Sequence, residues 1–170
     1  MAITATDIQF FLSGGAGNSN PNASLGGIIS STQITDASLH NLFDVVSGDE
    51  AAAGRTEFRA FYIKNNHGTL TWEAVKLWIT SNTPSTWDQV QIGIEASSGS
   101  PKQTIANETT APSSPTISFS EPTTKAGGLA LGDMAAGVVY MVWIRRVVTA
   151  GAQAYNANAF TLQAEGDTAP

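Results

Sequence analysis

The sequence predicts an all-β protein with the architecture of an antiparallel β-sandwich, and two observations support this prediction. Short runs rich in Val, Ile, Thr and aromatic residues alternate with clusters of Gly, Pro, Ser and Asn, which is typical of sandwiches and barrels. No stretch keeps a helical periodicity for more than about one turn. The chain has 170 residues and no Cys. A chain of this length buries roughly 70% of its unfolded surface, so one domain spanning residues 1–170 is expected to fold without disulfides.

Eight β-strands are predicted from the apolar and β-branched runs. They cover residues 8–13, 26–35, 56–65, 69–80, 87–96, 115–120, 137–148 and 158–164. A single helical turn is predicted at 48–54, because Asp49 and Glu50 suit a first turn and Gly54 suits a helix stop. The strand count favours a jelly-roll-like arrangement, with an immunoglobulin-like sandwich as the alternative.

Two long loops are predicted, at about residues 13–27 and 97–116. The first is rich in Gly and Asn, and the second is rich in Pro and Ser. Such segments are expected to run over the surface, since a buried loop would leave backbone polar groups without partners. The first loop and the strand at 137–148 are the segments that we expect to contact neighbouring molecules.

The strand at 137–148 is apolar on both faces. One face carries Val138, Tyr140, Val142 and Ile144, and the other carries Val139, Met141 and Trp143. A strand in a sandwich usually packs one face against the core and exposes the other to water. Because both faces of this strand are apolar, both are expected to be buried. Two interpretations are open: the second apolar face of the strand is covered by one of the long loops, or it is covered by a neighbouring subunit.

The charge balance argues against nucleic acid and membrane partners. The chain carries 8 Lys and Arg against 14 Asp and Glu, for a formal net charge of −6. Phosphate contacts are made mainly by clustered Lys and Arg, and here these residues are scattered. The longest apolar run, at 137–144, is far below the roughly 20 residues of a membrane-spanning helix. No export signal is visible, so synthesis in a cytoplasm is expected.

No residue pattern predicts catalysis, a cofactor or a metal. His67 lies in "NNHG", where a turn is expected, and His40 lies in a separate segment, so no His cluster forms. The carboxylates Asp44, Asp49 and Glu50 do not have the alternating spacing of a calcium loop, although a weakly held cation in this loop stays open. No nucleophile elbow or phosphate-binding loop occurs. The sequence therefore predicts a protein that is not an enzyme.

The aromatic residues are the candidate partner-interface residues. Without a bulge, Trp72 and Trp78 share one face of their strand, opposite Val75, Leu77 and Ile79. One of these faces then points outward, and outward tryptophans suit a protein interface or a sugar platform. A bulge near Glu73 would instead turn both tryptophans inward, and the sequence leaves the choice open. The candidate interface residues are Trp72, Trp78, Tyr140 and Trp143.

Three segments carry a resemblance to a known group of proteins. They are "DIQFFLSGGAGNSNPNASLGG", "NLFDVVSGDEAAAGRTEFRAFYIKNNHGTLTWEAVKLWI" and "LGDMAAGVVYMVWIRRVVTAGAQAYNANAFTL". Together they cover more than half of the chain and resemble small structural proteins of the virions of tailed bacteriophages and prophages. The Pro- and Ser-rich middle of the chain has no match in this resemblance.

The resemblance implies a capsid decoration (cement) protein that is not an enzyme. Such a protein binds the phage major capsid protein on the outer capsid surface of the virion, after synthesis in the host cytoplasm, and stabilises the head. Self-association is expected, with a trimer as the expected form. A neck, tail or fibre-anchoring component of the virion and a carbohydrate-binding module are the alternative functions.

Overall fold

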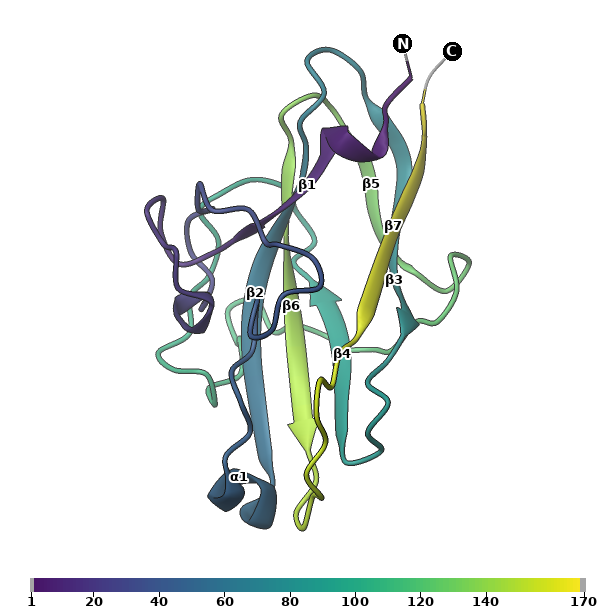
Figure 1. The fold of residues 1–170 in the computed structure, drawn as a ribbon. Coiled ribbons are helices and arrows are strands. Elements are labelled where there is room, and N and C mark those ends of the chain that lie inside the picture. Colours follow the sequence, from purple (N-terminus) through teal and green to yellow (C-terminus); the bar gives the residue numbers. More distant parts are fainter. Residues whose placement is uncertain (1, 169–170) are drawn as a thin grey trace.

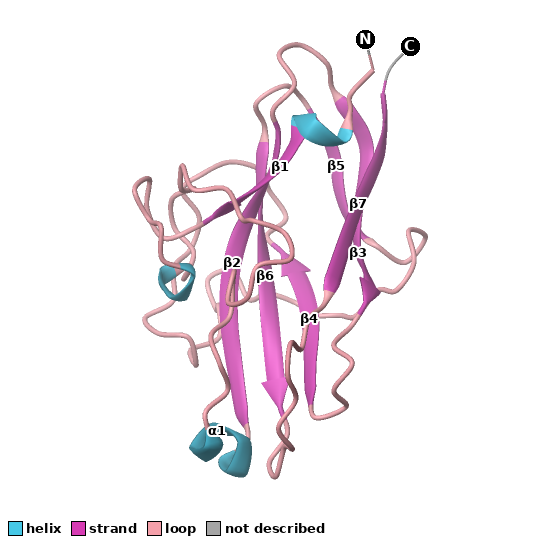
Figure 2. Ribbon diagram, in the orientation of Figure 1, coloured by secondary structure: helices cyan, strands magenta, loops and turns pink. Residues whose placement is uncertain are grey.

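The computed structural model describes residues 2–168, which form two antiparallel β-sheets packed face to face (Figures 1 and 2). The strands are β1 (Ile8–Leu12), β2 (Arg55–Asn65), β3 (Trp72–Ser81), β4 (Asp88–Ile94), β5 (Leu129–Met134), β6 (Val139–Val148) and β7 (Thr161–Thr168). The four-stranded sheet has the order β1-β2-β6-β4, and the three-stranded sheet has the order β5-β3-β7. The predicted all-β antiparallel sandwich is therefore confirmed.

Three segments differ from the prediction in whether they form a strand. Residues 26–35 and 115–120 form only isolated bridges, of which Phe11 with Gln33 and Ile92 with Ser120 are examples. Neither segment supplies a whole strand. The strand β5 was not predicted, because Gly132 and Asp133 interrupt its apolar pattern. The described residues form seven strands instead of the predicted eight, and this removes the ground for preferring a jelly roll.

The short helical elements lie in the connections. A 3₁₀ turn, η1 (Ala5–Asp7), precedes β1, and a second, η2 (Pro21–Ala23), lies in the first long loop. The helix α1 (Gly48–Ala53) is where a helical turn was predicted. Ser47 and Glu50 form a reciprocal capping box at its start, and Gly54 ends it with a φ of 76°.

The connection from β2 to β3 crosses from one sheet to the other, so "NNHG" does not close a hairpin. The Asn65 side-chain amide donates to the carbonyls of Leu70 and Met134, which belong to the second sheet or its approach. The Nδ1 atom of His67 accepts hydrogen bonds from the backbone N–H groups of Thr69 and Leu70, at 3.1 and 3.0 Å. His67 therefore has the predicted turn role, but it acts through its ring nitrogen and its φ is not positive.

The main core lies between the two sheets. The even-numbered residues of β6 and the odd-numbered residues of β2 face it, as Val142, Ile144, Phe61 and Ile63 illustrate. From the three-stranded sheet it is filled by apolar side chains that are at most 5% exposed. These are Trp72, Val75, Leu77, Ile79, Leu131 and Met134.

A second apolar cluster covers the outer face of the four-stranded sheet. Met141 and Trp143 of β6 are 0% exposed there, next to Phe58, Ala60 and Tyr62 of β2. Residues of the two long loops and their flanks lie over them and form what we call the loop roof: Leu25, Ile29, Ile105, Ile117 and Phe119. The loops thus cover the second face of β6 within one chain. Of the two interpretations of this strand, the loop interpretation is confirmed.

Gly26 allows the first loop to lie directly on Trp143. A Cβ atom at this position would be 3.0 Å from the Trp143 ring and would overlap the Gln103 carbonyl oxygen of the second loop. The φ of Gly26 is 89°, which L-residues rarely adopt. The loops also bond to each other, since Gly27 N–H donates to the Gln103 carbonyl and Ile105 N–H to that of Leu25. The roof is therefore one ordered layer.

A β-bulge bends β3 where the sequence left two alternatives open. The pairing register with both β5 and β7 shifts between Trp72 and Lys76, and Ala74 has a φ of 50°. The Ala74 N–H donates to a carboxylate oxygen of Asp133 at 2.9 Å. Because of the bulge, Trp72 and Val75 both face the core.

Replacing Ala74 with Gly is expected to stabilise the protein by about 0.5–1 kcal/mol. An L-residue in the left-handed region costs about 1–2 kcal/mol, and Gly removes this strain at a smaller entropic cost. Urea denaturation of the variant measures the gain. Ala52→Gly, at an exposed position of α1, is the matched control and should lose stability by about 0.5–1 kcal/mol. A loss of stability in both variants would contradict the assignment of strain to Ala74.

Candidate functional site

The predicted interface residues do not form an outward aromatic surface. Trp72 is 5% exposed and lies in the main core, and Trp143 is 0% exposed under the loop roof. Tyr140 is half-buried and packs against the main core. Trp78 is 6% exposed, although Leu77 and Ile79 on either side face the core and Trp78 therefore points to the other face of the sheet. The sequence left two alternatives open, and the structure matches neither fully: Trp72 is turned into the main core, and Trp78 is buried on the opposite face of β3.

The segment 121–128 explains the burial of Trp78. Its Pro122 carbonyl accepts a hydrogen bond from the Ile79 N–H, beside the β5 edge of β3. Its Lys125 forms an ion pair with Glu165 of β7, on the other side of β3. The Lys125 side chain therefore reaches across the outer face of β3, the face to which Trp78 points.

The apolar surface of the chain lies on its loops instead. Within residues 2–168, five large apolar side chains are exposed, by between 39% and 74%: Ile28, Leu39, Val45, Trp87 and Tyr155. None of them belongs to a strand or helix. Sequence reasoning missed three of them because loop residues follow no period that separates an inward from an outward position, and it placed Ile28 and Trp87 within predicted strands.

Trp87 and Tyr155 belong to the same end of the sandwich, next to α1. The Thr149 N–H donates to the Trp87 carbonyl, and the Ser85 N–H donates to the side chain of Asn158. The segment 85–88 therefore lies against both ends of the β6–β7 loop, which contains Tyr155. The same loop bonds to α1, because the N–H groups of Gly151 and Ala152 donate to the Ala51 carbonyl. We call this region, with α1, the α1 end (Figure 1).

A network of charged side chains, which we call the ionic cluster, lies between the main core and the α1 end. Its members are Arg55, Arg59, Arg146, Asp44, Glu50, Glu57 and Glu108. Arg146 Nε donates to Glu57 Oε2 at 2.7 Å, and Arg55 contacts Glu57 and Glu50, each at 2.8 Å. Arg55 and Arg59 both pair with Glu108 of the second long loop. The cluster thus joins β2, β6, α1 and two loops.

The pairing of β2 with β6 brings the buried side chains of the ionic cluster together. Arg55, Glu57 and Arg59 alternate along β2 and so share the face that points between the sheets. Glu57 is directly opposite Arg146 of β6 in the register. Phe43 covers both arginines, with its ring centre 5.7 Å from the Arg59 guanidinium and 4.6 Å from that of Arg146. Charged side chains here replace the apolar layer that fills the rest of the space between the sheets.

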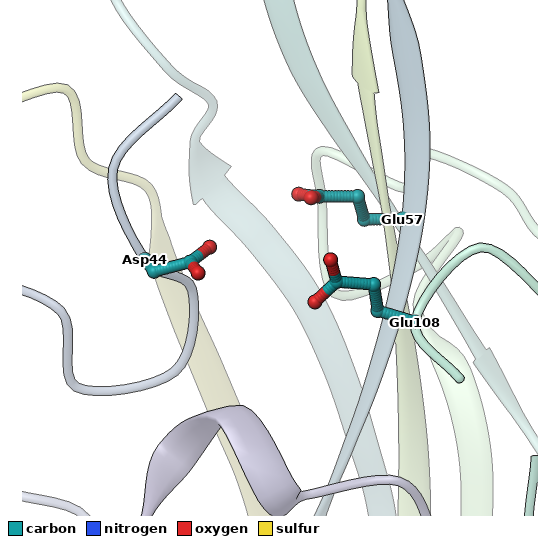
Figure 3. A group of neighbouring side chains, drawn as sticks. All are labelled: Asp44, Glu57 and Glu108. Carbon is teal, nitrogen blue, oxygen red and sulfur yellow. The ribbon is translucent and has the colours of Figure 1, made fainter. Parts of the chain in front are cut away.

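Three carboxylates of the cluster lie close enough to be compared with a metal site. Figure 3 shows Asp44, Glu57 and Glu108 pointing toward one another, with oxygens within 4.8 Å. Each of the three is already an ion-pair partner of at least one arginine. Three guanidinium groups among four carboxylates supply the positive charge that a cation would supply. This chemistry fits an ion-pair network better than a cation site.

The loop carboxylates proposed for a weakly held cation separate in the structure. Asp44 turns to Arg146, with 3.6 Å between Oδ1 and Nη2. Glu50 accepts hydrogen bonds from the Ser47 N–H and hydroxyl at 2.8 and 2.9 Å, and this holds its pKa below the ordinary value. Asp44 and Glu50 thus have separate structural partners, and Asp49 lies in the first turn of α1, as the sequence predicted.

Glu108 links stability to pH. Burial raises the pKa of this carboxyl, but the hydrogen bonds and charges of Arg59 and Arg55 outweigh burial and leave the pKa below its ordinary value of 4.5. A carboxyl whose folded pKa is lowered contributes stability above its unfolded pKa and loses it as the pH falls through the folded value.

The free energy of unfolding is therefore expected to fall as the pH drops below about 4.5, and Glu108→Gln should flatten this fall. Urea denaturation between about pH 3 and pH 7 measures both curves, in the range where carboxyl groups titrate. Glu121→Gln, at an exposed carboxylate outside the cluster, is the matched control. An unchanged pH dependence in Glu108→Gln would contradict the contribution of this ion pair.

A hollow at the opposite end of the sandwich holds the other candidate for chemistry. Its volume is about 410 Å³, and it is lined by Ala2, Thr4, Asp7 and His67. Asp7 accepts hydrogen bonds from the Thr4 N–H and hydroxyl, which lowers the pKa of its carboxyl. His67 holds the turn after β2 through Nδ1. Both polar groups therefore have a structural role in the local fold.

Comparisons of the chain with protein-family models, with curated proteins and with solved structures find no match. None of the helices within residues 2–168 has the length and apolar character of a bilayer-spanning helix.

Proposed function

We propose that this chain is a non-enzymatic structural protein of a bacteriophage virion, a capsid decoration protein that binds the major capsid protein on the outer surface of the head. The resemblance of its three segments to virion proteins supports the phage part of the proposal. The observation that carries the binding part is the exposure of large apolar side chains on ordered loops: Leu39 is 74% exposed, Val45 69% and Tyr155 55%. In the proposed complex the capsid covers these side chains, as partners cover the exposed apolar patches of other soluble proteins.

The proposed mechanism is burial of this apolar surface against capsid subunits. Fully burying one large apolar side chain contributes about 1.5–3 kcal/mol, and the contribution is repeated over every bound copy. The ion pair of Asp44 with Arg146 and the bonds of the β6–β7 loop to Ala51 of α1 hold parts of these loops in place before binding, which lowers the entropy cost of association. Self-association as a trimer belongs to the same proposal.

A carbohydrate-binding module is the second candidate. Sugar platforms need exposed aromatic rings, and burial of three tryptophans leaves Trp87, at 39% exposure, and Tyr155 for this task. These two side chains lie at the same end of the molecule, which is the observation that favours this candidate.

Binding of the purified protein to phage heads that lack it tests the proposal. We expect co-sedimentation with the heads and retention of packaged DNA to a higher temperature. No binding, or equal heat resistance with and without the protein, would overturn the decoration function. Binding to host glycans without binding to heads would support the carbohydrate-binding candidate.

Two surface variants distinguish binding to the head through apolar contacts from binding through non-specific attraction. Val45→Asp combined with Tyr155→Asp should weaken head binding by about tenfold or more, since two large apolar contacts are lost. Asn156→Asp adds a negative charge next to Tyr155 on the same exposed loop and should bind as wild type does. Equal binding by all three proteins would show that these apolar side chains are not the contact surface.

A further inference from the structure

The two sheets differ in how their edges are covered. In the four-stranded sheet, the segment 30–34 bonds along β1, through Ser30, Thr32 and Ile34. The part of β2 that extends beyond β1 donates from Phe58 and Ala60 to the carbonyls of Glu108 and Ser24. Ser120 exchanges two hydrogen bonds with Ile92 on β4. The chain thus places loop backbone against the edges of this sheet.

The strand β7 of the other sheet has no such cover. It pairs with β3 on one side. Within residues 2–168, no backbone hydrogen bond reaches its other side. The strand is eight residues long and stands last in the sheet order β5-β3-β7. Natural edge strands are usually short, bulged or covered, or carry charged side chains or Pro. The strand β7 has no Pro and no Lys, and its only charged residues are Glu165 and Asp167.

The side chains of β7 also indicate an open edge. Residues alternate between exposed and half-buried along its whole length. The half-buried residues include Leu162 and Ala164, which pack against the main core. Their counterparts on β3, Leu77 and Ile79, are at most 1% exposed. The core-facing side of β7 is therefore less covered than that of its neighbour, as expected for a strand that lacks a further strand beside it.

The outer face of the three-stranded sheet is acidic next to this edge. Asp167 of β7 is directly opposite Glu73 of β3, and the exposed Asp133 of β5 bonds to the backbone beside Glu73. Like charges directly opposite each other in a sheet are destabilising. Glu165 has Lys125 as an ion-pair partner and lies directly opposite Lys76 of β3, but neither Glu73 nor Asp167 forms an ion pair within the described part of the chain. A basic side chain beside Asp167 would relieve this repulsion.

We propose that the free edge of β7 accepts an extended segment of another protein as a fourth strand, and that this segment carries Lys or Arg beside Asp167 and Glu73. The backbone of the segment pairs with the unpaired N–H and C=O groups of β7. Its basic side chains supply the positive charge that the acidic pair lacks. The proposal concerns a surface other than the exposed apolar loops, and it stands without the phage assignment.

Charge argues against a second copy of this chain as the occupant. Two copies paired through β7 would bring a second Glu165 and a second Asp167 to the edge. The strand itself contains no Lys or Arg, so such a pair would not relieve the repulsion between Glu73 and Asp167. The basic segment therefore comes from a different protein.

Amide hydrogen exchange of the isotope-labelled full chain tests the proposal. The probe is a peptide of alternating Thr and Lys with the eight-residue length of β7. We expect alternate amides of 161–168 to exchange fast in the free protein and about tenfold more slowly with saturating peptide, because they gain hydrogen-bond partners. The control probe has the same sequence with N-methyl groups at alternate residues, which keeps its charge and removes the donors of one edge. Equal protection by both probes, or none by either, would overturn strand addition.

Paired charge variants test the basic character of the occupant. Glu73→Gln with Asp167→Asn should weaken binding of the Thr–Lys peptide by about tenfold at low salt, since both attractive charges are lost. Asp36→Asn with Asp49→Asn removes the same charge from exposed positions elsewhere and should have a smaller effect. Equal loss in both pairs would overturn the local charge argument. Protection of β7 that rises with protein concentration without peptide would identify a second copy as the occupant and overturn the foreign segment.

Discussion

Replacing Glu57 with Gln is expected to lower the free energy of unfolding by about 3–5 kcal/mol, the range measured when one partner of a buried ion pair is removed. Glu57 is 1% exposed and Arg146 is 7% exposed, and Glu57 Oε2 accepts from two nitrogens of the guanidinium. The variant leaves the Arg146 charge buried with Asp44 as its remaining carboxylate partner. Urea denaturation followed by circular dichroism measures the loss.

Two controls show whether burial is the cause. Lys125→Gln breaks the exposed ion pair with Glu165 and should leave the denaturation midpoint nearly unchanged, because solvent screens this pair. Glu57→Leu combined with Arg146→Met should recover most of the stability, since apolar side chains of similar size can replace a buried pair. A midpoint for Glu57→Gln equal to that of wild type would contradict the role of the ionic cluster.

Replacing Trp143 with Ala is expected to destabilise the protein by about 3–5 kcal/mol, as large-to-small changes in a packed core do. Trp143 is 0% exposed between β6 and the loop roof, with Gly26 of the first loop directly against its ring. Its loss removes the surface on which both long loops rest. The amides of Gly27 and Ile105, which bond the two loops together, should then exchange faster than the amides of β3.

Trp87→Ala is the matched control for this prediction. Trp87 is 39% exposed at the α1 end, so its removal should cost less than about 1 kcal/mol and leave exchange in the loops unchanged. If Trp143→Ala unfolds the chain entirely, Trp143→Phe is used, and loop exchange is measured under native conditions. Unchanged loop exchange in that variant would contradict the account of the roof.

The alternation of apolar and polar residues predicted which strands bury one face and which bury both. Val90, Ile92 and Ile94 alternate with polar residues in the strand that became β4, and the two apolar faces of 137–148 correctly indicated a covered central strand. Alternation has no information about which strands pair. The chain crosses from one sheet to the other at His67. The sequence alone could not distinguish this crossing from a hairpin.

The ionic cluster could be predicted only in part. Arg55, Glu57 and Arg59 alternate within an apolar strand, and this pattern is a signal of charged side chains on one face. Their partners, Arg146, Asp44 and Glu108, come from distant segments and depend on strand register and loop path. The open edge of β7 likewise depends on sheet order, which no local pattern determines.

The most direct test of the proposed function is an electron-microscopy reconstruction of the phage particle that contains this protein. The account predicts density on the outer surface of the head into which the two-sheet sandwich fits, with the exposed apolar loops against the capsid subunits. Density confined to the neck or tail, or a head surface without this sandwich, would contradict the decoration function.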